Sequence, residues 1–410
     1  MIDETARVAV VGAGHGGATV AALLRQSGFA GAIAIYGAEP HLPYQRPPLS
    51  KAGVHHGPDL LRPAVFYNDQ NIELCLRVPA HALDAAGSKL ELADGRHVGY
   101  DVAVLAAGAR PRRMLVAGAG LKGVHTLRTI DDAQALRGEL GPGRRLVIIG
   151  GGYIGLEIAA VARERGAEVV ILEGSDRILN RSAGPDIAKW ISNEHQSRGT
   201  RISTRVAVTG FGAGSEGSVT AVHTIDGDVP CDLVLLGIGA EPCEELARDA
   251  GLLCDGGVVV DTRARTSADG VYAVGDMTRR PVPPYPGLYR LESIPSTGEQ
   301  AKQAVSDILG KSAPRPEVPW FWSDQFHLKL QIAGLPALAE ASVVRGDPAL
   351  GRFAVYHFAA DQRVLAVEAV NAPNDFMAGK KWIAARVSVD VDAVADATRS
   401  LRTLVRSGES

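Results

Sequence analysis

The stretch VAVVGAGHGGATVAALLR, residues 8–25, organises the N-terminal half of the chain. Four apolar residues, Val8–Val11, predict a buried strand, and an apolar helix is expected over Ala18–Arg25. Between them lies a GxGxxG turn in the strand-to-helix context that such a turn needs. Its glycines let the backbone approach a diphosphate, which the free N–H groups at the helix N-terminus then hold. The stretch predicts a dinucleotide site.

A second copy follows in RLVIIGGGYIGLEIAAVARER, residues 145–165. Here the strand is Arg145–Ile149, the helix is Leu156–Arg165, and the next strand, Val169–Leu172, ends at Glu173. An acid at this place can accept a hydrogen bond from a ribose hydroxyl. Two turns of this kind imply two bound dinucleotides.

The duplication extends beyond the glycine turns. In each half a later apolar strand ends in the pattern G-x-x-P, at residues 108–111 and 239–242. A further short strand at residues 269–276 ends in Gly-Asp, and a helix is expected over Thr297–Leu309. The economical arrangement has the second unit inserted into the first. We therefore expect an α/β chain with two Rossmann-like domains, 1–112 with 250–318 and 113–249, followed by an α+β domain over 319–410.

Bulk composition excludes several classes of protein. The 410 residues are 46% hydrophobic and 22% charged, with a formal net charge of −3, which argues against a nucleic-acid partner. No apolar run approaches the length of a membrane span, and the N-terminus resembles neither a signal nor a transit peptide. A cytoplasmic protein without a membrane or nucleic-acid partner is expected.

Several motifs carry a resemblance over essentially the whole chain. They are GAGHGG at residue 12, PYQRPPLSK at 43, LRTIDDA at 127, VIIGGGYIGLE at 147, YAVGD at 272, LESIP at 291 and PWFWSDQ at 319. With them the chain resembles the FAD- and NADH-dependent ferredoxin reductases that serve bacterial haem-thiolate monooxygenases and Rieske dioxygenases. The resemblance implies hydride transfer from NADH to FAD, then single-electron transfers to a [2Fe–2S] ferredoxin, by a monomer or weak homodimer.

The resemblance also assigns site residues. For FAD it implies Gly12, Gly14, Gly16, Gly17, Glu39, Arg46, Lys51, Ala80, Arg128, Asp276, Ile294 and Trp322. For NADH it implies Gly150, Gly152, Tyr153, Ile154, Gly155, Glu173 and Gly239. Two of the residues have catalytic roles: Lys51 near the isoalloxazine, and Glu157, which pairs with it.

One position departs from the family pattern. Family members usually carry an acid where this chain has Ala38, so either Glu39 replaces it on the FAD ribose or that contact is lost. In the second half, Glu173 would repel a 2′-phosphate and accept a bond from a 2′-hydroxyl, which favours NADH; Arg177 nearby could blunt this preference.

Alternative functions remain open at this point. The four cysteines, Cys75, Cys231, Cys243 and Cys254, form no CxxC or CxxxxC pair, so no thiol relay is expected. An NADH oxidase or a rubredoxin reductase would share both glycine turns, although the oxidase usually needs a redox cysteine within residues 41–51. A flavin-bound redox-sensing or partner-binding protein is a further alternative. For ferredoxin docking, candidate cations are Arg62, Arg279, Arg280, Lys329, Lys380 and Lys381.

Overall fold

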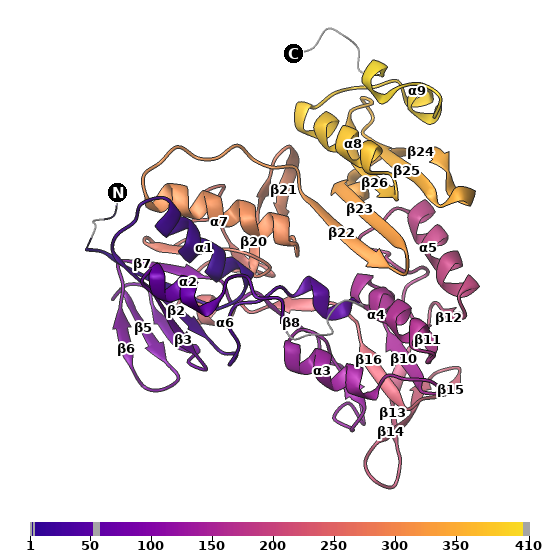
Figure 1. Cartoon of the computed structure of the whole chain (residues 1–410), viewed down its shortest axis with the longest axis horizontal. Coiled ribbons are helices and arrows are strands. Elements are labelled where there is room, and N and C mark those ends of the chain that lie inside the picture. The colour runs from indigo at the N-terminus through magenta and orange to yellow at the C-terminus, as the bar shows by residue number, and fades with distance from the viewer. Residues whose placement is uncertain (1, 3–4, 52–57, 405–410) are drawn as a thin grey trace. The chain divides into compact units, whose positions relative to one another are not determined.

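A computed structural model describes residues 2, 5–51 and 58–404 of the chain (Figure 1). The chain divides into two compact units. The first unit comprises Met1–Gln45, His56–Arg110 and Ala240–Pro319, and the second comprises Arg46–His55, Pro111–Gly239 and Trp320–Ser410. Each unit therefore gathers segments that lie far apart in the sequence.

The first unit is built on a five-stranded parallel sheet in the order β19-β7-β1-β2-β3. The strands of this sheet are β1 (Arg7–Val11), β2 (Ala32–Gly37), β3 (Ile72–Leu76), β7 (Val102–Leu105) and β19 (Val271–Ala273). Because β19 comes from beyond residue 250 and pairs with β7, the predicted insertion of the second half into the first is confirmed.

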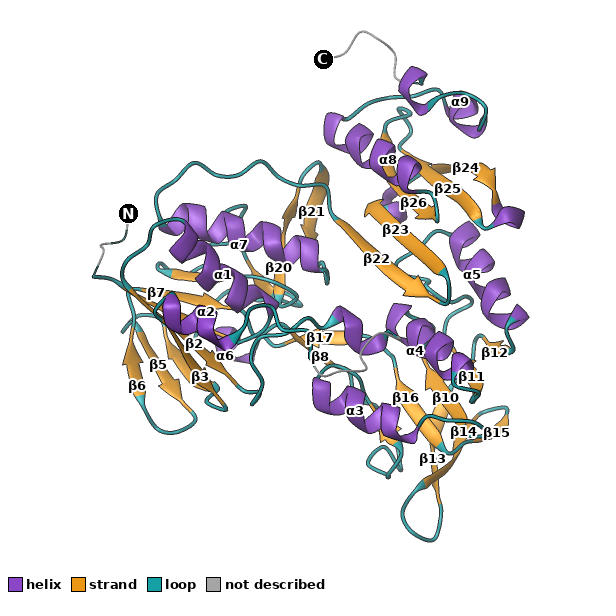
Figure 2. Cartoon of the chain, in the orientation of Figure 1, coloured by secondary structure: helices purple, strands orange, loops and turns teal. Residues whose placement is uncertain are grey.

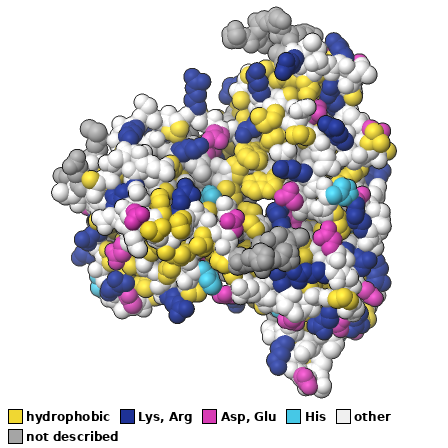
Figure 3. Space-filling view, in the orientation of Figure 1, with side chains coloured by type: hydrophobic (Ala, Val, Ile, Leu, Met, Phe, Trp, Pro, Cys, Tyr) yellow, Lys and Arg dark blue, Asp and Glu magenta, His cyan; other side chains and the backbone are white. Residues whose placement is uncertain are grey.

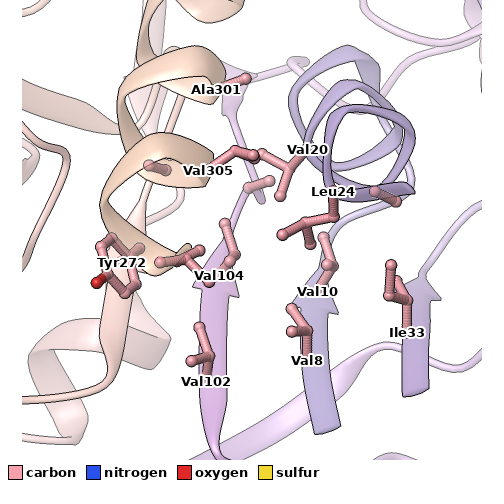
Figure 4. Packing of buried hydrophobic residues seen from close by; sticks show 14 of the residues in the cluster. Val8, Val10, Val20, Leu24, Ile33, Val102, Val104, Tyr272, Ala301 and Val305 are labelled. Atoms are coloured by element: carbon pink, nitrogen blue, oxygen red, sulfur yellow. The ribbon is translucent and has the colours of Figure 1, made fainter. Parts of the chain in front are cut away.

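Helices cover one face of this sheet (Figure 4). α1 (His15–Gln26) and α7 (Ile294–Ile308) pack against each other and against the strands. Val8 and Val10 of β1 point into this helical layer, where Val20 and Leu24 of α1 meet Val305 of α7. Burial of such side chains stabilises the layer by about 1.5–3 kcal/mol for each large aliphatic residue.

The alternate residues of β1 face the other way. Ala9 and Val11 join a second core with Leu90 and Leu92, which belong to an antiparallel sheet of order β4-β5-β6. A strand that is buried on both faces of a parallel sheet has a continuous run of apolar residues, and Val8–Val11 is such a run. The remaining elements of this unit are α2 (Ala64–Asp69), β4 (Ala80–Asp84), β5 (Lys89–Leu92), β6 (His97–Gly99), β17 (Ala240–Pro242), α6 (Glu245–Asp249), β18 (Val258–Val259), β20 (Thr278–Val282) and β21 (Tyr285–Tyr289), with β8 (Ala109–Pro111) at its boundary.

The second unit repeats the parallel architecture in a sheet of order β12-β11-β10-β16-β9. These strands and the helices near them are β9 (Val124–His125), α3 (Ile130–Glu139), β10 (Arg145–Ile149), α4 (Tyr153–Glu164), β11 (Glu168–Leu172), α5 (Pro185–Ser197), β12 (Thr200–Ser203) and β16 (Leu233–Leu236). A three-stranded antiparallel sheet, β13 (Val208–Ala213), β14 (Val219–Thr224) and β15 (Gly227–Pro230), corresponds to β4-β5-β6 of the first unit. The duplication seen in the sequence is thus a duplication of fold.

The same unit contains an antiparallel sheet of order β22-β23-β26-β25-β24 (Figure 2). Helix α8 packs on β23 and β26 through Phe376, Trp382 and Ile383, which are buried. The elements here are β22 (Trp320–Gln325), β23 (Leu328–Gly334), β24 (Ala341–Asp347), β25 (Arg352–Phe358), β26 (Val364–Val370), α8 (Pro373–Ala385) and α9 (Val391–Ala395). The predicted α/β fold with a C-terminal α+β region is confirmed.

Candidate functional site

The first glycine turn admits no side chain at two of its positions. Gly12 has φ +114°, and a Cβ on it would lie 2.3 Å from the carbonyl oxygen of Ala106. A Cβ on Gly17 would lie 2.0 Å from the carbonyl oxygen of Gly12. The bare backbone leads directly into α1, whose N-cap is Gly14, and no side chain in the described part of the chain caps that end. The turn therefore leaves helix N–H groups for an anion such as a diphosphate, as FAD requires.

His15, the first residue of α1, has an unusual environment. Its Nδ1 is buried and has no hydrogen-bond partner among the residues that the structure describes. Burial lowers the pKa of its imidazole; the charge of Asp276 opposes this and that of Arg62 adds to it. A neutral ring with a free nitrogen suits a site where a polar ligand binds.

The other residues assigned to FAD in the first unit lie at the ends of its elements. Asp276 follows β19 at the carboxyl edge of the parallel sheet, and Ile294 is the first residue of α7. Glu39 comes two residues after β2 and accepts a hydrogen bond of 2.6 Å from the Tyr44 hydroxyl. Ala80 is the first residue of β4. Ligands of open parallel sheets bind at this carboxyl edge, so the positions of Asp276 and Glu39 suit the assignment.

The second turn has the same design. Gly150 has φ +98°, and a Cβ on it would lie 2.5 Å from the carbonyl oxygen of Gly237. Gly152 is the N-cap of α4, which likewise has no side-chain cap in the described residues. Glu173 lies just beyond β11, where its two carboxylate oxygens accept backbone N–H bonds from Gly151 (2.6 Å) and Ser175 (2.7 Å). These bonds hold the acid beside the turn, and its remaining lone pairs can accept ribose hydroxyls.

The next residues of this turn differ in exposure. Ile154 is 46% exposed. Burial raises the pKa of the Tyr153 hydroxyl, which donates to the carbonyl oxygen of Ser182 at 3.2 Å, and the Tyr153 ring packs edge-on against Phe321 at 4.8 Å. Gly239, with φ +93°, lies three residues beyond β16. The exposed positions are the ones that a second dinucleotide can reach.

Arg177 is held within its own loop. Its guanidinium donates to the carbonyl oxygens of Ala183 at 3.0 Å and Asn180 at 3.1 Å, with a longer contact of 3.5 Å to Leu179. These bonds fix the loop between β11 and α5. They also direct the guanidinium toward the backbone carbonyls of that loop.

Lys51 and Glu157 form the predicted ion pair. The Lys51 Nζ lies 2.6 Å from Glu157 Oε1 and 3.4 Å from a carboxylate oxygen of Asp324. Glu157 lies in the second turn of α4 and is 5% exposed, and Ser50 and Ser323 also donate to its carboxylate. The pairing of Lys51 with Glu157 is thus observed, whereas the contacts of Ser50, Ser323 and Asp324 were not predicted.

A sequence signal for the unpredicted residues existed in PWFWSDQ. On a strand, successive side chains point to opposite faces, so Ser323 and Gln325 share one face of β22 and Asp324 lies on the other. The ring of Trp322, on the same strand, lies 5.7 Å from the ring of Trp320, measured between centroids.

Two other residues of the second unit that the resemblance assigns to FAD are in contact. Arg46 donates to the carbonyl oxygen of Arg128 at 2.7 Å.

The cysteines provide no thiol pair. Cys75, Cys231, Cys243 and Cys254 are all free. Burial raises the pKa of the Cys231 thiol to about 11, so this sulfur stays protonated and unreactive at neutral pH. Within the described residues there is also no cluster of His, Cys, Asp and Glu side chains that could hold a metal ion. The same residues include no helix that is both long and apolar enough to cross a membrane.

Two parallel-sheet units, each with a glycine turn before an uncapped helix, define a protein that binds two dinucleotides, as flavin-dependent oxidoreductases do. Comparisons with known proteins agree. Residues 6–306 match the family described as pyridine nucleotide-disulphide oxidoreductase, and residues 320–405 match a family described as reductase C-terminal. The chain belongs to the pyridine nucleotide-disulphide oxidoreductases and, within them, to the ferredoxin reductases.

Similar proteins cover nearly the whole chain. The probable ferredoxin reductase CtmF of Castellaniella defragrans is 46% identical over 93% of this chain and 94% of its own. Rhodocoxin reductase of Rhodococcus erythropolis is 39% identical over 97% of this chain and 94% of its own. Putidaredoxin reductase, solved in covalent complex with putidaredoxin, superposes with a TM-score of 0.95 at 37% identity, covering 98% of each chain.

Proposed function

We propose that this protein is an FAD-dependent NADH:ferredoxin oxidoreductase that supplies electrons to a haem-thiolate monooxygenase or a Rieske dioxygenase. The observation that carries the proposal is the pair of glycine turns of the same build, one in each unit, in a chain whose relatives are ferredoxin reductases. FAD, when bound, accepts a hydride from NADH and passes electrons one at a time to the ferredoxin.

We assign the dinucleotides to the turns as the resemblance implies. FAD binds in the first unit at the turn of Gly12, Gly14, Gly16 and Gly17, with the α1 N-terminus on its diphosphate. NADH binds in the second unit, with its diphosphate at the α4 N-terminus. The proposal includes three domains, residues 1–112 with 250–318, 113–249 and 319–410, since this division assigns one dinucleotide to each of the first two.

Glu173 supports the preference for NADH. Its carboxylate is fixed by two backbone N–H groups and can accept hydrogen bonds from the adenosine ribose. A 2′-phosphate at the same place would bring two negative groups together. The Arg177 guanidinium donates to carbonyl oxygens of its own loop.

Lys51 supplies positive charge for the reduced flavin in this proposal. An ammonium group stabilises negative charge that develops during reduction, and Glu157 keeps that group in one orientation. The proposed reaction needs little acid–base chemistry from the protein, because hydride transfer depends mainly on positioning. With four free cysteines, none of which belongs to a CxxC pair, the electrons pass to the acceptor without a thiol relay.

The ferredoxin partner is expected to be of the [2Fe–2S] type and acidic. One candidate docking residue is excluded: Arg280 is 2% exposed and pairs with the buried Glu299 at 2.6 Å. Arg279 is paired with Asp255. On the face drawn in Figure 3, Lys and Arg side chains lie among Asp and Glu side chains. A cytoplasmic location and a monomeric or weakly dimeric chain complete the proposal.

The test compares electron acceptors. Purified protein should be yellow, and NADH consumption should be fast with a [2Fe–2S] ferredoxin plus cytochrome c, and slow with oxygen or cytochrome c alone. Equal rates with oxygen alone would instead favour an NADH oxidase. Tight NADH binding without turnover on any acceptor, rubredoxin included, would favour a redox-sensing protein.

A further inference from the structure

Glu157 is the end of a longer buried chain of hydrogen bonds. Ser323 Oγ donates to Glu157 Oε1 at 2.6 Å, and Gln325 Nε2 donates to Ser323 Oγ at 3.1 Å. Gln325 Oε1 in turn lies 2.9 Å from His195 Nε2. His195 on α5 is fully buried, and Ser323 and Gln325 are 1% and 3% exposed. This series of hydrogen bonds connects α5, β22 and α4, which all belong to the second unit.

The donors in this chain can point in only one direction. A serine hydroxyl has one hydrogen, and at 2.6 Å from a carboxylate it is given to Glu157. The Ser323 oxygen must then accept, so the amide NH₂ of Gln325 faces it and the amide oxygen faces His195. His195 Nε2 must therefore carry the hydrogen of a neutral imidazole, a form that burial favours by lowering the pKa of the ring.

The side chains of this hydrogen-bond series are almost completely buried among apolar neighbours. Ser323 and Gln325 line a small void whose other walls are Trp190, Ile191, Leu328, Leu330 and Val370. Hydrogen bonds in such surroundings are stronger than in water and reinforce one another when their dipoles align. Since His195, Gln325 and Ser323 are almost completely buried, a disturbance at His195 or Gln325 is passed to Ser323.

We infer that Ser323, Gln325 and His195 are positioning residues, which hold the Glu157 carboxylate in the orientation that fixes the Lys51 ammonium group. This inference rests on the proposed role of Lys51 in flavin reduction. This series of hydrogen bonds orients the Glu157 carboxylate and does not conduct protons, because the Gln325 amide does not readily pass a proton on. Asp324, on the opposite face of β22, contacts Lys51 at 3.4 Å, so one strand acts on the lysine directly and through Glu157.

The test follows flavin reduction by NADH in stopped-flow experiments. Ser323→Ala removes a donor to a charged acceptor, and we expect the rate to fall by about tenfold, the lower end of the range for such bonds, since Lys51 and Ser50 still contact Glu157. Gln325→Leu and His195→Phe should give losses of about threefold each, typical of a neutral hydrogen bond. Ser323→Thr, which keeps the hydroxyl, should restore the rate.

A double mutant separates positioning from general damage. In a Lys51→Met background, Ser323→Ala should cause no further loss, because it acts only through that lysine. A second measurement does not need turnover: acetylation of Lys51, followed by mass spectrometry, should be faster in Ser323→Ala than in the unaltered protein. FAD content and melting temperature show that the variants are folded.

The results of these experiments test separately the proposed role of Lys51 and the positioning role of Ser323, Gln325 and His195. If Lys51→Met reduces its flavin at the normal rate, the proposed role of Lys51 fails. If Lys51→Met is slow but Ser323→Ala is normal in both rate and acetylation, the inference alone is overturned. It is also overturned if Ser323→Ala slows the reaction by the same factor with and without Lys51.

Discussion

Glu173→Gln tests the choice of nucleotide most directly. The substitution keeps the size of the side chain but removes its charge. Two backbone donors, from Gly151 and Ser175, now point at this group, and an amide has only one oxygen to offer them. One N–H must therefore face the NH₂ group, and the acceptor strength toward the ribose falls as well.

The magnitudes follow from the charge. Loss of one hydrogen bond to a charged acceptor costs about 1.5–3 kcal/mol, so we expect the KM for NADH to rise by roughly tenfold or more. For NADPH the change has the opposite sign. Two unit charges 4 Å apart at an effective dielectric constant of 20 repel by about 4 kcal/mol, and solvent at the partly exposed site reduces this. A fall of about 100-fold in the kcat/KM preference for NADH over NADPH is expected.

The assay is steady-state reduction of cytochrome c through ferredoxin, with each nucleotide in turn. Glu168→Gln is the matched control, because it makes the same charge change at the exposed other end of β11. The control should leave the preference unchanged. The reasoning is refuted if Glu173→Gln keeps the preference of the unaltered protein, or if Glu168→Gln changes it equally.

Three further predictions concern stability and reactivity. Gly17→Ala places a Cβ 2.0 Å from a carbonyl oxygen of the turn and should abolish FAD retention, measured as the 450 to 280 nm absorbance ratio, whereas Gly138→Ala, with open space around it, should be neutral or stabilising. Asp232→Asn should cost about 1 kcal/mol in urea unfolding at pH 7, because Arg145 lowers the pKa of that carboxyl; the difference should shrink as the pH falls past the ordinary value of 3.8 and vanish below the lowered pKa of the folded state. Cys231, with a pKa of about 11, should resist thiol reagents in the folded protein and react after unfolding.

Strands were the most predictable elements of the fold. The segment Arg145–Ile149 has the bounds that the sequence predicts, since a parallel strand buried on both faces contains an almost continuous apolar run. Helix starts were less predictable. α1 begins at His15 and not at Ala18, because tertiary contacts hold two glycines of low helix propensity in its first turn.

The strand β4 (Ala80–Asp84) was missed, because its sequence AHALD has few residues that favour strands. Within the site, the family resemblance predicted the ion pair of Lys51 with Glu157. It did not predict the contacts that Ser50, Ser323 and Asp324 make with this pair. The bond between His195 and Gln325 joins residues 130 positions apart, and no periodic pattern records such a contact. Buried polar networks of this kind depend on the packing of three elements and are visible only once the chain is folded.

One helix connects the nucleotide turn to the buried lysine pair. Glu157 lies four residues after Tyr153, the first residue of α4, and so about 6 Å along the helix axis. Gly155, between them, packs so closely on the turn that a Cβ would lie 2.8 Å from the Gly150 carbonyl oxygen. Because these contacts leave little room for sliding, a shift of the α4 N-terminus would move the Glu157 carboxylate as well. We therefore expect nucleotide binding at this turn, as proposed, to be coupled to the orientation of Lys51 through α4.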